Sequence, residues 1–340
     1  MELHTVFQVN CLCASSFGFA LNFFLLFLIS YKTPSAMRSY ARIMRIHVIT
    51  DLLYDFAILF TGVHPVPIGG KVYLITQGFY THTDISFIRY VCAWYFWVIL
   101  IAIALLPIDF FYRFKSVCHN TELQSRTIYI QVFFAYFITW LHAFPNSFNY
   151  MEIGPRSESA EFTSELQRFE LFNTTDGVPS YSVTVLGGTK ALSNFIFILL
   201  LNAFVYTVIT YTSIRIYYAL KHNAHKIQNS KAAELQRQVT RILALQASLP
   251  LLIICVPTIG IVSLALAHID VPQAGAISVS ILSWLSAVKP AATIAVVPRY
   301  RTYVKTKLFG NNASAHLIKG ITTKISDLSG INQSENHNVH

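Results

Sequence analysis

Seven apolar stretches, each long enough to cross a bilayer, constrain the fold of this chain more than any other feature of its sequence. A hydrocarbon core about 30 Å thick takes roughly 20 residues of α-helix to cross, because each residue adds about 1.5 Å. The stretches that meet this length lie at residues 7–30, 42–62, 87–111, 128–148, 192–220, 239–268 and 274–297. The sequence therefore predicts an all-α membrane protein whose residues 1–309 form a seven-transmembrane helix bundle.

The charged residues predict how this bundle sits in the membrane. Only 12% of the residues are charged, against about 25% in soluble domains. The net charge of +9 does not indicate a nucleic-acid surface, because 19 of the 25 Lys and Arg residues lie in or beside alternate loops, at residues 31–45, 112–128 and 215–241, or after the last span, at residues 299–340. The positive-inside rule then places the N-terminus outside and the tail in the cytoplasm. We expect an uncleaved first span and no nucleic-acid partner.

The connecting segments carry fewer signals. The longest one, residues 149–190, is extracellular under this topology, and its Ser, Thr, Glu and Gly content indicates little packed structure. It contains the sequon Asn173-Thr174-Thr175, so Asn173 is predicted to be glycosylated. The tail, residues 310–340, is rich in Asn, Ser, Thr and His and is predicted to be a disordered cytoplasmic segment.

Enzymatic and metal-dependent classes find no support in the sequence. The five cysteines show no metal-ligand spacing. No phosphate-binding glycine loop, nucleophile elbow or cluster of histidines and carboxylates is present. We expect no enzyme activity, no metal ion and no cofactor.

Ionisable residues inside the spans are the strongest functional signal, because a charge at the bilayer centre costs at least about 2.5 kcal/mol and usually faces a partner in the bundle interior. His47, Asp51 and Asp55 are four residues apart and share one face of the second span. Asp51 and Lys289 lie at depths that agree within roughly 5 Å. We therefore predict an Asp51–Lys289 pair that ties the second span to the seventh and holds a two-state bundle in one arrangement. The alternative is that backbone carbonyls and water satisfy these groups, without a role in switching.

Two further sets of residues are weaker candidates. Pro250 lies at the depth where a hinge in the sixth span would be needed, although prolines are common in membrane helices. A ligand pocket is expected among the outer halves of the spans, lined by apolar and aromatic groups with few polar anchors. Its candidate residues are Arg89, Tyr90, Trp94, Trp97 and His268. Aromatic residues here could equally serve packing or the interfacial belt.

Four short motifs lie at the predicted membrane borders. The first inner loop contains Lys32-Thr33-Pro34-Ser35-Ala36-Met37, and the third span ends in Phe110-Phe111-Tyr112-Arg113-Phe114. Leu235-Gln236-Arg237-Gln238 lies at the start of the sixth span, and Pro298-Arg299-Tyr300-Arg301 closes the seventh. Together they resemble the K-T-P-x-x-M loop, the F-x-Y-R-Y/F end of the third span, the start of the sixth span and the closing P-Y-R of nematode serpentine chemoreceptors. Serpentine receptor class d is the best match, with sister classes such as Srh and Str close to it.

This resemblance implies a G-protein-coupled receptor of chemosensory neurons that detects a small environmental molecule, as in olfaction. It also implies a plasma-membrane location, with the sensory cilium as a candidate site, and a heterotrimeric G protein as partner. Arg113, Arg237 and Arg241 are then candidates for a basic coupling face, although ordinary topology accounts for their charge as well. The chain departs from rhodopsin-like receptors at its seventh span, where Lys289-Pro290-Ala291-Ala292-Thr293 stands in place of N-P-x-x-Y. Lys289 lies too near the cytoplasmic end to match the retinal lysine of an opsin.

Two other membrane classes remain as alternatives. A seven-span ligand-gated channel of the insect odorant-receptor type would have its N-terminus inside, which the distribution of cations contradicts. A transporter would show repeat symmetry and broken helices at matching positions of its two halves, and neither is visible. The sequence favours the receptor.

Overall fold

The computed structural model describes residues 3–33, 38–76, 85–119, 121, 123–150, 159–169, 178, 180–223, 248–249 and 251–307. The chain divides into two compact units, Met1–Ala292 and Thr293–His340. In the second unit, residues 298–307 are helical, and the predicted disordered tail, 310–340, lies outside the described residues.

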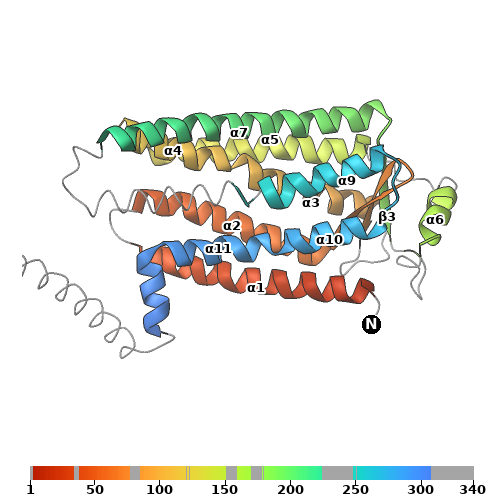
Figure 1. Cartoon of the computed structure of the whole chain (residues 1–340), viewed down its shortest axis with the longest axis horizontal. Coiled ribbons are helices and arrows are strands. Elements are labelled where there is room, and N and C mark those ends of the chain that lie inside the picture. The colour runs from red at the N-terminus through yellow and green to blue at the C-terminus, as the bar shows by residue number, and fades with distance from the viewer. Residues whose placement is uncertain are drawn as a thin grey trace, which may run out of the picture. The chain divides into compact units, whose positions relative to one another are not determined.

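Long helices that run side by side make up most of the first unit (Figure 1). They are α1 (Leu3–Tyr31), α2 (Arg38–Thr61), α3 (Ile85–Ala104), α4 (Leu106–Cys118), α5 (Ser125–Tyr150), α7 (Thr189–Asn223), α9 (Val256–Leu266), α10 (Pro272–Ser283) and α11 (Leu285–Val296). Among the described residues, five helical segments are long and apolar enough to cross a membrane: Val6–Tyr31, Phe87–Cys118, Ser125–Pro145, Ala191–Ala219 and Pro272–Val296. The predicted all-α bundle is confirmed.

The two remaining predicted spans differ from these five for separate reasons. Helix α2 is 24 residues long, but its ionisable side chains lower its hydropathy. The sixth span is represented by a π-helical turn, Leu251–Cys255, followed by α9. Most of residues 239–250, including Arg241 and Pro250, lie outside the described part of the chain, as does Arg237.

Two of the breaks within the described spans coincide with prolines. Pro107 stands in the first turn of α4, directly after the break that separates α4 from α3. Pro257 likewise stands in the first turn of α9, directly after the π-helical turn. Proline lacks the N–H that an interior helical position would donate, so a helix restarts at these positions or bends there.

A three-stranded antiparallel sheet covers one end of the bundle, here called the sheet end; the opposite end is called the far end (Figure 1). Strands β1 (Val63–Ile68) and β2 (Lys71–Thr76) form a hairpin after α2, and β3 (Tyr181–Val185), which precedes α7, pairs with β2. Gly69 and Gly70 make the two-residue turn, with φ of 55° and 76°, as a type I′ turn requires. Strand β1 holds two prolines and is an edge strand, where proline breaks no ladder hydrogen bond.

The sheet and the short helix α6 (Ser159–Gln167) share a small apolar core outside the bundle. Its fully buried members are Val66, Ile68, Tyr73, Ile75, Leu166 and Val183, with Phe162 and Tyr181 packed beside them. The expectation that residues 149–190 hold little packed structure is therefore wrong for the described part of this segment. The apolar residues that form this core are distributed over two loops, and neither loop alone carries an extended apolar pattern.

A charged hydrogen-bonded group closes this core. Lys71 Nζ lies 2.8 Å from Glu165 Oε2, and the Tyr73 hydroxyl donates to the same oxygen. Burial raises the pKa of the Tyr73 phenol well above its usual range, and the hydrogen bond to the Glu165 carboxylate raises it further. Tyr73 therefore stays a protonated donor at neutral pH and ties the sheet to α6.

The sheet is also attached to the helices α9 and α10, which pack against β1. The Gly69 N–H donates to Asp270 Oδ1 at 2.8 Å. A methyl group at Gly70 would meet the imidazole of His268 at 2.5 Å, and one at Gly275 would collide with the backbone carbonyl of Pro65. His268 and Pro65 lie closer to these two glycines than a side chain there would permit. Glycine at both positions therefore allows the sheet to lie directly on α10 and on the turn before it.

Candidate functional site

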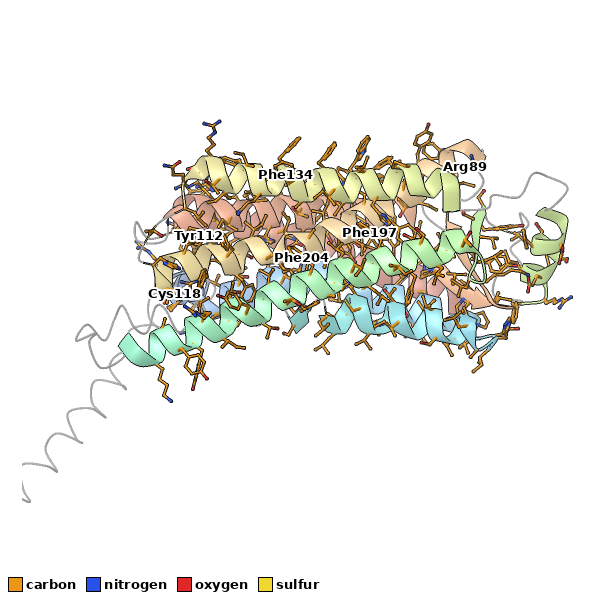
Figure 2. All side chains as sticks on the ribbon, turned by 90° about the horizontal axis from the view of Figure 1, so that it is seen from above. Arg89, Tyr112, Cys118, Phe134, Phe197 and Phe204 are labelled. Atoms are coloured by element: carbon orange, nitrogen blue, oxygen red, sulfur yellow. The ribbon has the colours of Figure 1, made fainter. Side chains whose placement is uncertain are left out.

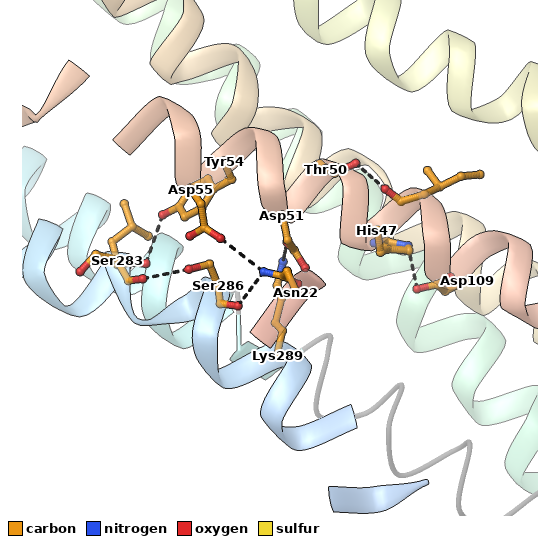
Figure 3. Close-up of polar contacts among 12 residues, drawn as sticks. Asn22, His47, Thr50, Asp51, Tyr54, Asp55, Asp109, Ser283, Ser286 and Lys289 are labelled. Carbon is orange, nitrogen blue, oxygen red and sulfur yellow. Dashed lines mark hydrogen bonds and ion pairs between the residues drawn. The ribbon is translucent and has the colours of Figure 1, made fainter. Parts of the chain in front are cut away.

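Buried polar side chains line α2 from the middle of the bundle toward the far end, and each has partners on a neighbouring helix (Figure 3). Asp55 faces α1, Asp51 faces α11 and His47 faces α4. Their spacing of four residues keeps them along one stripe of the helix, as predicted. The stripe meets α1 and α11 at Asp55, α11 at Asp51 and α4 at His47, because α2 lies between these helices.

The predicted pair of Asp51 and Lys289 is confirmed as a contact. Lys289 Nζ lies 2.7 Å from Asp51 Oδ1. The two residues are only 8% and 7% exposed, so neither charge is screened by water. An ion in such surroundings is tolerated when its counter-ion is held at hydrogen-bond distance. The pair therefore joins α2 to α11 at a fixed point in the bundle, while its role in switching stays a prediction.

Asp55 belongs to a second polar cluster, formed with Asn22 on α1 and Ser286 on α11. Asn22 Nδ2 lies 3.3 Å from Asp55 Oδ2 and 3.1 Å from the Ser286 carbonyl oxygen. That carbonyl lacks its usual helical donor because the residue four positions later is Pro290. The Asn22 amide takes the place of the missing backbone N–H, so α1 repairs the defect that proline makes in α11.

Gly18 makes the close approach of α1 to this cluster possible. A methyl group at Gly18 would collide with the Ser286 hydroxyl and lie 2.8 Å from Asp55 Oδ1. One helical turn separates Gly18 from Asn22, so the two residues face the same partners. Tyr54 adds a further link between α2 and the last span by donating to the Leu282 carbonyl at 3.2 Å.

Toward the far end, α2 contacts α4 instead of α11. His47 Nε2 lies 2.9 Å from Asp109 Oδ2, and both side chains are largely buried. One turn further along α4, Arg113 is 7% exposed and its guanidinium lies 5.6 Å from the centre of the Tyr40 ring. Helix α2 thus contacts the last span through Asp51 and the third span through His47 and Tyr40.

Two of the five residues predicted to bind a ligand, Trp94 and Trp97, are placed in packing contacts with neighbouring helices. Trp94 packs against Phe56 and Phe60 of α2, with ring centres 5.4 and 5.7 Å apart. Trp97 faces α5 instead and donates its indole N–H to the Tyr136 carbonyl at 3.2 Å. Arg89 lies at the sheet end, whereas Tyr112 and Cys118 lie toward the far end (Figure 2).

Two other ligand candidates lie outside the packed interior. Tyr90 is 53% exposed, and His268 is an exposed residue of the α9–α10 turn with φ of 53°. The ligand-binding role of all five residues stays a prediction.

Comparison with known proteins identifies the class of molecule that carries this arrangement. Residues 6–305 match the family described as serpentine type 7TM GPCR chemoreceptor Str. The chain belongs to the Str family of serpentine chemoreceptors. Nothing among the curated proteins matches it. The predicted superfamily is confirmed, and the matching class is Str, one of the sister classes, in place of class d.

A Str chemoreceptor is expected to share the fold of other seven-helix receptors, and the structural comparison agrees. The crystal structure of squid rhodopsin is similar to this chain with a TM-score of 0.66, over 90% of this chain and 85% of the rhodopsin chain. Sequence identity over that alignment is 11%, so the likeness concerns the fold. The Str chain is a multi-pass membrane receptor of the G-protein-coupled type and is not an enzyme.

Several residues of the Str receptor's polar site were absent from the sequence-based candidates. They are Gly18, Asn22, Tyr40, Asp109 and Ser286. Asn22 is detectable from sequence as one of the few polar residues of the first span, and Asp109 as a carboxylate at the end of the third. The predicted coupling residues Arg237 and Arg241, the predicted hinge Pro250 and the predicted glycan acceptor Asn173 lie outside the described residues.

Proposed function

We propose that this Str receptor detects a small environmental molecule in the half of its bundle nearer the sheet and activates a heterotrimeric G protein at its far end. Membership of the Str family across residues 6–305 carries the receptor assignment. The buried contacts along α2 support a switching role, because they join the last span to the third, where Arg113 lies. A movement of the third or the last span would therefore change contacts with α2, the helix that both spans share as a partner.

The proposed orientation places the N-terminus and the sheet outside the cell and the far end in the cytoplasm. The excess of Lys and Arg in the loops at the far end supports this orientation. The resemblance to serpentine chemoreceptors supports the plasma membrane as the site of action, with the sensory cilium of a nematode chemosensory neuron as the specific location that it implies.

The orientation predicts a glycan on Asn173. The receptor expressed in animal cells is expected to lose apparent mass on treatment with peptide N-glycosidase, and the Asn173→Gln variant is expected to run at the deglycosylated mass without treatment. Asn332→Gln, at a sequon in the tail, serves as the matched control and should leave the mass unchanged. A glycan on Asn332 would show that the tail lies outside the cell and would contradict the proposed orientation.

The ligand is proposed to be small and mostly apolar, because the side chains around Trp94, one of the proposed contacts, are aromatic. Arg89, Tyr90, Trp94, Trp97 and His268 remain the proposed contacts. The Asp51–Lys289 pair, with His47, Asp55 and the proline Pro250, is the proposed switch. Arg113, with Arg237 and Arg241, is proposed to meet the G protein.

Loss of the Arg113 guanidinium is expected to abolish signalling. Cells that express the receptor with each class of G protein would be assayed for activation, with and without a panel of small molecules. Arg113→Ala is expected to remove the signal at equal surface level, because no other cation of α4 lies at the buried site of Arg113, where it can take over contact with the G protein. Arg126→Ala, which removes an exposed cation of α5, controls for the loss of one positive charge and should signal normally.

The same assay distinguishes the receptor from the alternative classes. If no G protein responds in any condition while the panel evokes a current or substrate flux, the chain acts as a ligand-gated channel or a transporter. If Arg113→Ala signals as well as the parent receptor, G-protein coupling does not depend on the end of α4.

A further inference from the structure

Arg113 is buried although it stands only five residues before the end of α4. A guanidinium is among the least tolerated groups in an apolar interior, and it stays there only when neighbouring groups compensate for lost water. Tyr40 of α2 provides one such group, because the face of its ring lies 5.6 Å from the Arg113 guanidinium carbon. This distance is within the range of a cation–π interaction.

The Tyr40 ring is itself packed against a second aromatic ring. Tyr112 stacks on it, with ring centres 6.1 Å apart and planes 26° from parallel. Tyr40 and Tyr112 are 5% and 6% exposed, so both rings lie in the packed interior with Arg113. Replacing the Tyr40 ring by a non-aromatic side chain would remove its cation–π contact with the guanidinium.

A second contact fixes the same two helices nearer the middle of the bundle. His47 is seven residues from Tyr40, which is two helical turns, and Asp109 is one turn from Arg113. The helices run in opposite directions, so Tyr40 meets Arg113 and His47 meets Asp109 along one seam. Helix α2 therefore holds the end of α4 at two points.

We propose that Tyr40 is a positioning residue that keeps Arg113 buried in the resting receptor and releases it on activation. The inference rests on the proposed function, in which Arg113 meets the G protein. A buried guanidinium cannot donate hydrogen bonds to a partner protein, so coupling requires the side chain to leave the Tyr40 ring. The strength of the ring contact then sets how often the receptor activates without a ligand.

The test compares two substitutions that both remove the Tyr40 hydroxyl. Tyr40→Leu also removes the aromatic face, whereas Tyr40→Phe keeps it. We expect Tyr40→Leu to raise ligand-independent G-protein activation by up to about thirtyfold at equal surface level, the factor that corresponds to a desolvated cation–π contact of ~2 kcal/mol. Tyr40→Phe is expected to stay within about twofold of the parent receptor.

A third substitution tests the contact in the opposite direction. Tyr40→Trp offers a stronger aromatic face to the cation and is expected to lower ligand-independent activation below that of the parent. It keeps the proposal testable if Tyr40→Leu fails to reach the cell surface. Equal activity of the Leu and Phe variants, a silent Leu variant at full surface level, or no decrease with Trp would each overturn the proposal.

Combining each substitution with Arg113→Ala separates this proposal from the proposed function. If Arg113→Ala abolishes signalling while Tyr40→Leu leaves basal activity unchanged, coupling through Arg113 holds and the role of Tyr40 is wrong. If Tyr40→Leu raises activity and the added Arg113→Ala change does not remove that increase, the increase does not act through Arg113. The proposed role of Tyr40 and the proposed coupling through Arg113 are then both wrong.

Discussion

Lys289→Met is expected to destabilise the folded receptor by about 3–5 kcal/mol, because it leaves the Asp51 carboxylate buried without its counter-ion. Asp55, one turn away on α2, adds a second carboxylate to the same region. Methionine has nearly the length of lysine, so the change removes the charge and little of the packing. The measurement is the fraction of receptor that reaches the cell surface, together with thermal stability of the detergent-purified protein.

The double variant Asp51→Asn/Lys289→Met is the matched control for this experiment. It removes both charges, so no unpaired ion is left in the bundle, and it is expected to recover most of the surface level lost in either single variant. Replacement of a buried ion pair by neutral groups is often close to neutral for stability. A double variant as poor as the two single losses combined would show that the 2.7 Å contact contributes no coupling energy.

Gly275→Ala is expected to destabilise the attachment of the sheet to α10 by about 3 kcal/mol or more. The added methyl group would collide with the backbone carbonyl of Pro65, and a backbone atom cannot rotate away as a side chain would. The sheet should then separate from the α9–α10 turn. Limited proteolysis of the purified receptor would detect this change as faster cleavage within 63–76, and thermal unfolding would report the loss of stability.

Gly260→Ala gives the control within the neighbouring helix α9. A methyl group at Gly260 meets nothing within 4 Å, and alanine favours helix over glycine by about 1 kcal/mol. We expect this variant to be as stable as the parent or slightly more stable. If Gly275→Ala and Gly260→Ala behave alike, the close approach of Pro65 to Gly275 does not hold the sheet on α10 in the purified receptor.

The level of a residue along the bundle was predictable from the sequence, whereas the rotation of each helix was not. The hydropathy pattern brought Asp51 and Lys289 to the same level, and the structure joins them. His47 and Asp55 share a face with Asp51, yet they contact α4 and α1 respectively. A pattern of apolar residues defines which face is buried but not which neighbour it meets, so these partners required coordinates.

The sequence carried a signal for only part of the sheet. Gly69-Gly70, followed by the apolar run of β2, is typical of a two-residue hairpin turn, and the sequence-based prediction missed it. Strand β1 contains two prolines in six residues, a composition that argues against a central strand. Strand β3 is five residues long within a polar loop, and its pairing with β2, distant in the sequence, required coordinates.

The pairing of β2 with β3 has a consequence for the synthesis of this receptor. Lys71 pairs with Val185, 114 residues later in the chain. At a translation rate of about 5–20 residues per second, the β1–β2 hairpin exists for roughly 5–25 s before its third strand is made. During that time one edge of β2 lacks its partner, and unpaired strand edges promote aggregation. The free edge of β2 is therefore open to pairing with other chains until the segment just before the fifth span has been made.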